Sequence, residues 1–177
     1  MPHIHTGPGM HDLTTSALVF KIDSDVPKVL FHMHKKQNKL MNPGGHVELN
    51  ENPWQAILHE LEEETGYAAH QLKIYQPPWA ISSLSGAISH PIPFCVNTHE
   101  IGDTDHFHTD MTYIFSTDSY PENQVGEGES SDLRWLTYDE VEQLDDSSTV
   151  LTVRDYTLRA FKECLTWDSV LLDNYSA

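Results

Sequence analysis

The stretch Pro43–Tyr67, PGGHVELNENPWQAILHELEEETGY, decides the fold. Asn52 is a suitable N-cap, Pro53 suits the first helical position, and Gln55 completes a capping box. Gly66 follows the helix, because glycine accepts the left-handed backbone conformation that ends helices. The sequence therefore predicts a glycine turn and then a helix that begins at Pro53 and ends before Gly66.

One side of this predicted helix is apolar, and an acidic arc lies beside it. The apolar residues recur at the spacing i, i+3, i+4 and i+7, which predicts a stripe facing a core; they are Trp54, Ile57, Leu58 and Leu61. Glu60, Glu63 and Glu64 share an arc of roughly 100° next to that stripe. The helix contributes both a core face and a cluster of carboxylates.

The position of these glutamates is unfavourable for the helix alone. They lie in its last two turns, where the helix dipole disfavours each anion by roughly 0.3–1 kcal/mol, and they repel one another. A compensating cation is therefore expected. Clustered carboxylates beside a glycine turn suit Mg²⁺ or Mn²⁺. The alternative is a solvated acidic face, which is common in acidic proteins.

The spacing of the whole stretch resembles the Nudix box. Gly45 is followed after five residues by Glu51 and after seven more by the segment 59–67, HELEEETGY. The family pattern is G-x5-E-x7-R-E-U-x-E-E-x-G-U, with U apolar or aromatic. It fixes about nine positions over about twenty-three residues, so it is far more specific than a short glycine motif. One defined position departs from it, because His59 replaces the arginine.

The rest of the chain predicts a mixed sheet with few helices. We expect one domain over residues 1–177, with residues 1–14 irregular. The expected strands cover 16–22, 29–33, 40–42, 72–75, 79–83, 93–100, 107–117 and 133–137, with a turn at 23–25. Helices are expected at 138–144 and, at the C-terminus, at 153–172. The resemblance implies an α/β fold, a Nudix-like α/β/α sandwich with a mixed β-sheet.

Composition restricts the partners. The net charge of −17 argues against nucleic acid and against anionic membrane surfaces. An anionic substrate would need metal ions or a local basic patch. No apolar run is long enough to span a membrane, and the start lacks the pattern of a signal peptide. Cys95 and Cys164 lack CxxC spacing, which indicates free thiols in a reducing cytoplasm.

The resemblance implies a reaction and a metal. Nudix enzymes cleave nucleoside diphosphates linked to another moiety, and a metal-activated water attacks phosphorus. By resemblance, Mg²⁺ or Mn²⁺ is held by the carbonyl of Gly44 and by the carboxylates of Glu60, Glu63 and Glu64. These three glutamates are also the implied catalytic residues. Glu51 is expected to support the loop and helix geometry and to take part in proton handling.

The general base is expected either within the box or on a later loop. The loop candidates are Glu127 and Glu129. Glu129 is favoured because a glutamate six residues before the position of Trp135 recurs in similar proteins. The alternative for either residue is a loop glutamate in water.

Two groups of residues are predicted to bind substrate. The polar segment 34–39 holds Lys35 and Lys36 and three of the ten basic residues, so it is a candidate phosphate contact or else a solvated hairpin tip. His106 and His108 alternate with Asp110 on one strand face, near His99. His46, which follows the glycine turn, is predicted to join them.

Three roles are compatible with these histidines. They could contact the phosphate or base of a substrate, bind a transition metal, or line a cleft as polar residues.

Two other functions are compatible with the pattern. Because His59 is shorter than arginine and titrates near neutrality, the protein could be a Nudix-fold sensor that binds a metabolite without turnover. An isopentenyl-diphosphate isomerase is less compatible, because Gly44 stands where its catalytic cysteine would fall. The expected substrate is a nucleotide, an ADP-ribose-like molecule or a dinucleotide. Nudix relatives often pair, so a homodimer is compatible with the resemblance.

Overall fold

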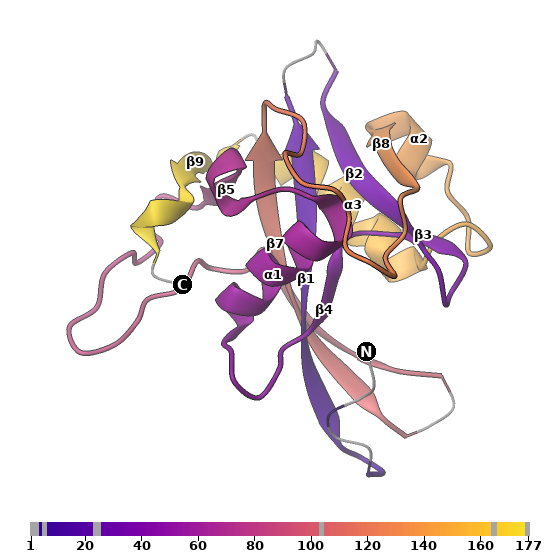
Figure 1. Ribbon diagram of the computed structural model, residues 1–177, viewed down its shortest axis with the longest axis horizontal. Coiled ribbons are helices and arrows are strands. Elements are labelled where there is room, and N and C mark those ends of the chain that lie inside the picture. Colours follow the sequence, from indigo (N-terminus) through magenta and orange to yellow (C-terminus); the bar gives the residue numbers. More distant parts are fainter. Residues whose placement is uncertain (1–3, 5–6, 23–25, 103–104, 164–165, 176–177) are drawn as a thin grey trace.

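A mixed β-sheet organises the protein, as the computed structural model shows (Figure 1). The structure describes residues 4, 7–22, 26–102, 105–163 and 166–175. Within these ranges the sheet has nine strands, and its main path runs β3-β2-β1-β7-β5-β9. The strands are β1 (His11–Lys21), β2 (Lys28–His34), β3 (Lys39–Met41), β4 (Gly44–His46), β5 (Lys73–Gln76), β6 (Cys95–Glu100), β7 (Phe107–Thr117), β8 (Leu133–Thr137) and β9 (Asp168–Leu171).

The helices lie on both faces of this sheet (Figure 1). They are α1 (Pro53–Thr65), α2 (Tyr138–Glu142) and α3 (Leu151–Glu163), with short 3₁₀ turns η1 (Ala69–Gln71) and η3 (Leu172–Asn174). The predicted α/β class is therefore confirmed. Among the described residues, each helix is too short or too polar to cross a bilayer.

Strand β1 has partners on both sides. It runs parallel to β7 along its whole length, from His11 opposite Phe107 to Lys21 opposite Thr117. Its other edge pairs antiparallel with β4 and, further along, with β2. Because successive side chains on a strand point to opposite faces, β1 contributes to both layers of the sandwich.

Two apolar clusters fill the two layers. On one face, Trp54 of α1 is fully buried and stacks on Phe115 of β7, with ring centroids 5.9 Å apart. On the other face, Phe161 of α3 packs edge-on against Phe20 of β1 at 4.9 Å. Replacing a buried tryptophan by alanine typically costs about 3–5 kcal/mol, so Trp54 is a principal anchor of α1.

Helix α1 forms as its local sequence predicts. The Asn52 side chain accepts hydrogen bonds from the backbone N–H groups of Trp54 and Gln55, both at 3.0 Å. The Gln55 side chain accepts one in return from the Asn52 backbone at 3.0 Å. Gly66 follows in the left-handed conformation at φ 76°. The capping box and the glycine stop are therefore confirmed.

Three predictions of secondary structure are wrong. Residues 11–14 were expected to be irregular with 1–10, but they form the start of β1, because pairing with β7 buries their alternate side chains. The C-terminal helix expected at 153–172 ends at Glu163, and β9 follows it, pairing antiparallel with β5. Residues 79–83 are not a strand, and Trp79 is 69% exposed. The turn predicted at 23–25 and Cys164 lie outside the described residues.

Candidate active site

The glycine turn brings strand β4 against helix α1. The backbone N–H of Gly44 donates a hydrogen bond to Glu64 Oε2 at 2.8 Å. A Cβ added at Gly45 would lie 2.0 Å from Glu60 Oε1. A Cβ added at Gly44 would lie 2.2 Å from the carbonyl oxygen of Thr15 on β1. Gly44 therefore requires glycine because its contacts are with backbone, and a side chain at Gly45 would displace the Glu60 carboxylate. The turn places its backbone directly against two of the predicted carboxylates.

Glu60 and Glu64 are buried, at 5% and 6% exposure. Burial, followed by the charge of Glu63, raises the pKa of Glu60 to about 7. Burial raises the pKa of Glu64 to about 9, although the Gly44 N–H opposes the shift. Glu60 Oε1 has no hydrogen-bond partner among the described residues. Two buried carboxylates with an unsatisfied oxygen are costly alone, and hard oxygen donors of this kind fit Mg²⁺ or Mn²⁺.

His59 lies where it can brace the outer carboxylates. Its Nε2 is 3.0 Å from Glu63 Oε1, and its Nδ1 is 3.8 Å from Glu51 Oε2. Burial lowers the pKa of His59, but the hydrogen bond to Glu63 and the charges of Glu63 and Glu51 outweigh it, so the pKa is raised. The side chain is half exposed. His59 thus contacts two neighbouring glutamates of the box.

Glu51 also closes the turn before the helix. Its Oε1 accepts a hydrogen bond from the backbone N–H of Glu48 at 3.0 Å, and its own N–H donates to the Glu48 carbonyl at 3.2 Å. These contacts fit the supporting role predicted for Glu51. Glu63 is half exposed, so its carboxylate can still face a ligand.

The loop at 121–129 docks on the C-terminal end of α1. Its Asn123 N–H donates to the Gly66 carbonyl at 3.1 Å, and its Gly126 N–H donates to the Glu63 carbonyl at 2.7 Å. These bonds satisfy carbonyls that a helix end leaves without partners. The loop that bears both candidate bases is therefore fixed to the helix that bears the glutamates.

Within this loop the two candidate bases differ. Glu127 is exposed, whereas Glu129 is half-buried. The charge of Glu129 contributes to the raised pKa values of both Glu60 and Glu64. Lys35 Nζ donates to the carbonyl of Gly128 at 2.7 Å, so this predicted phosphate contact is tied to the same loop. Lys36 is exposed, and its contact with substrate stays a prediction.

One buried residue of this site was missed by the sequence reasoning. His32 of β2 is almost fully buried, with Nδ1 3.9 Å from Glu64 Oε1. Burial and the neighbouring charge of His34 lower the pKa of His32 to about 4, so the ring is neutral at pH 7. The alternation of β2 gives the signal, because His32 stands two residues from the core residue Leu30.

The histidines predicted to bind substrate form a separate cluster, away from the glutamates. Rings of His46 and His108 are 4.8 Å apart between centroids, and those of His106 and His108 are 5.5 Å apart. Asp12, which the sequence reasoning did not select, lies among them, with Oδ2 3.3 Å from His106 Nε2. Asp12 was missed because its segment was expected to be irregular. Asp110 is engaged by hydroxyl groups instead.

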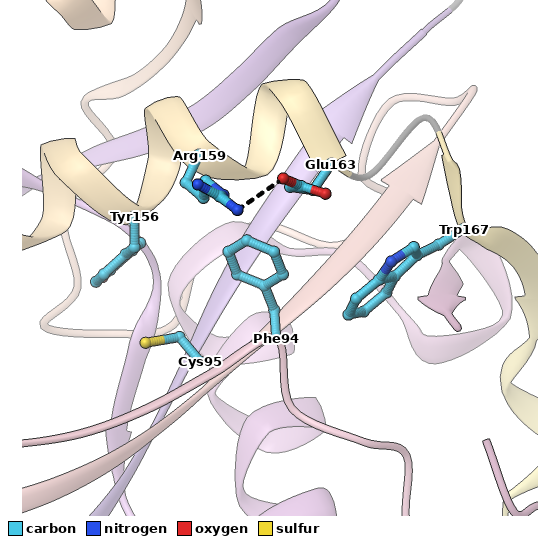
Figure 2. A pocket seen from close by; sticks show the side chains of 6 residues that line it. All are labelled: Phe94, Cys95, Tyr156, Arg159, Glu163 and Trp167. Carbon is cyan, nitrogen blue, oxygen red and sulfur yellow. Dashed lines mark ion pairs between the residues drawn. The ribbon is translucent and has the colours of Figure 1, made fainter. Parts of the chain in front are cut away.

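A separate hollow of about 360 Å³ lies between α3 and the start of β6 (Figure 2). It is lined by Phe94, Cys95, Tyr156, Arg159, Glu163 and Trp167. Arg159 Nη2 pairs there with Glu163 Oε1 at 2.9 Å. Burial raises the pKa of the Cys95 thiol, which makes this cysteine a poor nucleophile. The predicted site residues lie outside the lining of this hollow.

A buried glutamate pair thus lies on helix α1, held against the glycine turn and next to a loop that is docked on the helix end. Oxygen donors of this kind fit a divalent cation. The family model of the NUDIX domain matches residues 11–153. The chain therefore belongs to the Nudix family, and the resemblance found in the sequence is confirmed.

Comparisons with individual proteins agree with this assignment. The chain is 45% identical over 60 residues to the probable DHNTP pyrophosphohydrolase of Lactococcus lactis subsp. cremoris (strain MG1363), a stretch that covers 34% of each chain. The match thus spans about a third of that relative. A NUDIX-family hydrolase from Clostridium perfringens has a TM-score of 0.66 and 28% identity, covering 86% of this chain and 97% of that chain.

A more distant solved structure shows the fold alone. The NUDIX domain of Shewanella oneidensis NrtR, complexed with ADP ribose, has a TM-score of 0.61 and 18% identity, covering 88% of each chain.

Proposed function

We propose that the protein is a metal-dependent hydrolase that cleaves the diphosphate linkage of a nucleoside diphosphate attached to another moiety. The observation that supports this most is the buried pair Glu60 and Glu64, whose unsatisfied oxygen faces a glycine turn. The names of its relatives agree, because one is a probable pyrophosphohydrolase and another was solved with ADP ribose.

Glu60, Glu63, Glu64 and the Gly44 carbonyl would hold Mg²⁺ or Mn²⁺. When bound, such a cation neutralises diphosphate charge and lowers the pKa of bound water. The protein supplies the orientation. The Gly44 N–H fixes one oxygen of Glu64, the close packing of Gly45 fixes the carboxylate of Glu60, and His59 positions Glu63.

Glu129 is proposed as the general base, which accepts the proton of the attacking water. It is half-buried on a loop anchored to α1, and its charge reaches both buried glutamates. Glu51 is proposed to hold the turn and His59. The net charge of −17 repels an anionic substrate, so the cation and the basic segment with Lys35 and Lys36 are proposed to attract it.

One assay tests the activity. Nucleotides, dinucleotides, sugar nucleotides and ADP-ribose are incubated with Mg²⁺ or Mn²⁺, and phosphate-containing products are followed. We expect turnover of at least one compound and its loss in Glu64→Gln. If no compound is turned over, the hydrolase proposal is wrong, and binding without turnover identifies a metabolite sensor.

A matched pair of variants tests the base. Glu129→Gln is expected to lower kcat by about 10²–10⁴, the usual contribution of a general base. Glu127→Gln, two residues away on the same loop and exposed, should leave kcat unchanged. Equal rates for the two variants would place the base elsewhere.

A further inference from the structure

A second group of ligating side chains lies on the opposite face of the sheet. Asp12 of β1 stands opposite His108 of β7, and His46 of β4 stands opposite Thr14, two residues along β1 from Asp12. Residues two apart on a strand share a face. Three adjacent strands, β4, β1 and β7, therefore direct these side chains toward one another.

This face is separate from the glutamate site. Gly45 and its β1 partner Thr15 belong to the side that faces Glu60. His46 and Thr14 stand one residue away on their strands and so point to the other side, where Thr14 donates to Asp110 at 2.9 Å. The two groups thus lie on either side of the same short strand pair.

The geometry of this second group is compact. One ligand atom from each of Asp12, His46 and His108 lies within 4.8 Å of the others. Asp12 is fully buried and His46 has a side-chain exposure of 11%. Asp12 Oδ2 accepts the backbone N–H of Ile4 at 3.0 Å and lies 3.6 Å from His46 Nε2. Imidazole nitrogens and a carboxylate oxygen grouped in this way form a donor set that transition metals use.

The neighbouring carboxylate is different. Asp110 accepts hydrogen bonds from the hydroxyl groups of Thr14, Ser16 and Thr112, each at 2.9 Å. Both carboxylate oxygens of Asp110 therefore accept hydrogen bonds from side chains of β1 and β7. The carboxylate that faces the histidines is therefore Asp12, and His106, with Nε2 at 3.3 Å from Asp12 Oδ2, holds it in place.

We propose that Asp12, His46 and His108 form a binding site for one divalent transition metal ion, for which Zn²⁺ is the probe. Two imidazoles and a carboxylate suit Zn²⁺, whereas the all-oxygen set of Glu60 and Glu64 suits Mg²⁺. Tetrahedral coordination at about 2.0–2.1 Å places ligand atoms about 3.4 Å apart. Because these atoms now lie within 4.8 Å of one another, the side chains would close by up to about 1.4 Å. Three protein ligands leave one position open for water or an anion.

Zn²⁺ and Co²⁺ binding to the full chain test the proposal, with Mg²⁺ present in excess to fill the glutamate site. We expect one Zn²⁺ per chain by calorimetry, and a Co²⁺ visible spectrum of tetrahedral type that Zn²⁺ abolishes. His46→Gln and His108→Gln should each weaken Zn²⁺ binding by at least about 10–100-fold, the loss caused even by indirect partners of a ligand.

Two controls isolate the site. His99→Gln changes an exposed ring 5.7 Å from that of His108, outside the three ligands, and should bind Zn²⁺ as the parent does. Glu64→Gln should also retain it. Zn²⁺ binding that survives in both ligand variants, or that is lost in Glu64→Gln alone, would overturn the proposal.

A measurement on the unaltered protein covers the case in which a variant fails to fold. Imidazole resonances are followed by NMR during Zn²⁺ addition. Those of His46 and His108 should change together at one equivalent, before that of His70 on the surface. Unchanged His46 and His108 resonances at one bound equivalent would contradict the proposal.

Discussion

Gly66→Ala is expected to lower the stability of the fold more than Gly86→Ala, although the two glycines have the same backbone conformation. Their φ angles are +76° and +77°. The left-handed conformation costs an alanine roughly 1–2 kcal/mol, and the reduced freedom of the unfolded chain returns about 0.4–1 kcal/mol. Because both terms apply to both variants, they cancel when the variants are compared.

The surroundings of the two positions differ. A Cβ at Gly66 would lie 2.2 Å from the carbonyl oxygen of Asn123, whereas nothing lies within 4 Å of a Cβ at Gly86. The contact at Gly66 is with backbone, so the docked loop must move. Overpacking of this kind typically costs about 1–3 kcal/mol. For a chain of this size, that difference lowers the unfolding temperature of Gly66→Ala by about 2–12 °C relative to Gly86→Ala.

Thermal unfolding followed by circular dichroism measures this difference, and kcat provides a second readout. Displacing the loop weakens the bonds from Asn123 and Gly126 to α1, so kcat should fall in Gly66→Ala at temperatures where that variant is folded. Gly86→Ala should retain the parent rate. If the two variants unfold at the same temperature, the loop is not held against the helix end as described.

Three further predictions concern the bracing histidine, a surface turn and the cation. His59→Ala should lower kcat about 10-fold, the usual loss for a residue that orients metal ligands, because it loses the contacts to two glutamates. His70→Ala, which removes an exposed ion pair on η1, should leave kcat unchanged. Equal rates for the two variants would show that His59 does not act in the site. Hydrogen bonds from two serines lower the pKa of Asp145 to about 2. The ionised Asp145 therefore stabilises the fold fully above about pH 4, and this contribution is lost as the pH falls toward 2. The urea midpoints of Asp145→Asn and of the parent should converge over that range, and a constant difference between them would contradict the prediction. Mg²⁺ at 100 times its Kd should stabilise the protein by about 2.7 kcal/mol, which scanning fluorimetry detects as a higher unfolding temperature. Glu64→Gln should show little of this increase. A full increase in that variant would show that the cation binds elsewhere.

Features set by neighbouring residues could be predicted from the sequence. The capping box at Asn52, the stop at Gly66 and the amphipathic face of α1 depend on contacts within a few residues. The spacing of the box then supplied the family and the glutamate cluster. These are local patterns, and the structure retains them.

Features that depend on pairing between distant segments could not be predicted from the sequence. The start of β1 is a strand because β7, nearly a hundred residues later, pairs with it, as does β4 at Thr14. Strand β9 forms because β5 offers it an edge. Asp12 acquires its surroundings through such pairing, so it does not stand out in a linear sequence. The only local signal for His32 is the alternation of β2. Glu129 was selected by its spacing to Trp135, but the docking of its loop on α1 depends on backbone bonds from Asn123 and Gly126.

The three-residue strand β4 imposes a constraint on chain length. It pairs with β1 from Thr14 opposite His46 to Ser16 opposite Gly44. A slip of one residue would turn each side chain to the other face. If Gly45 moved opposite Thr14, His46 would point toward Glu60 and a glycine would take its place beside Asp12. Insertions or deletions between Leu40 and His46 should therefore disable both sites together, whereas the exposed segment around Gly86 should tolerate them.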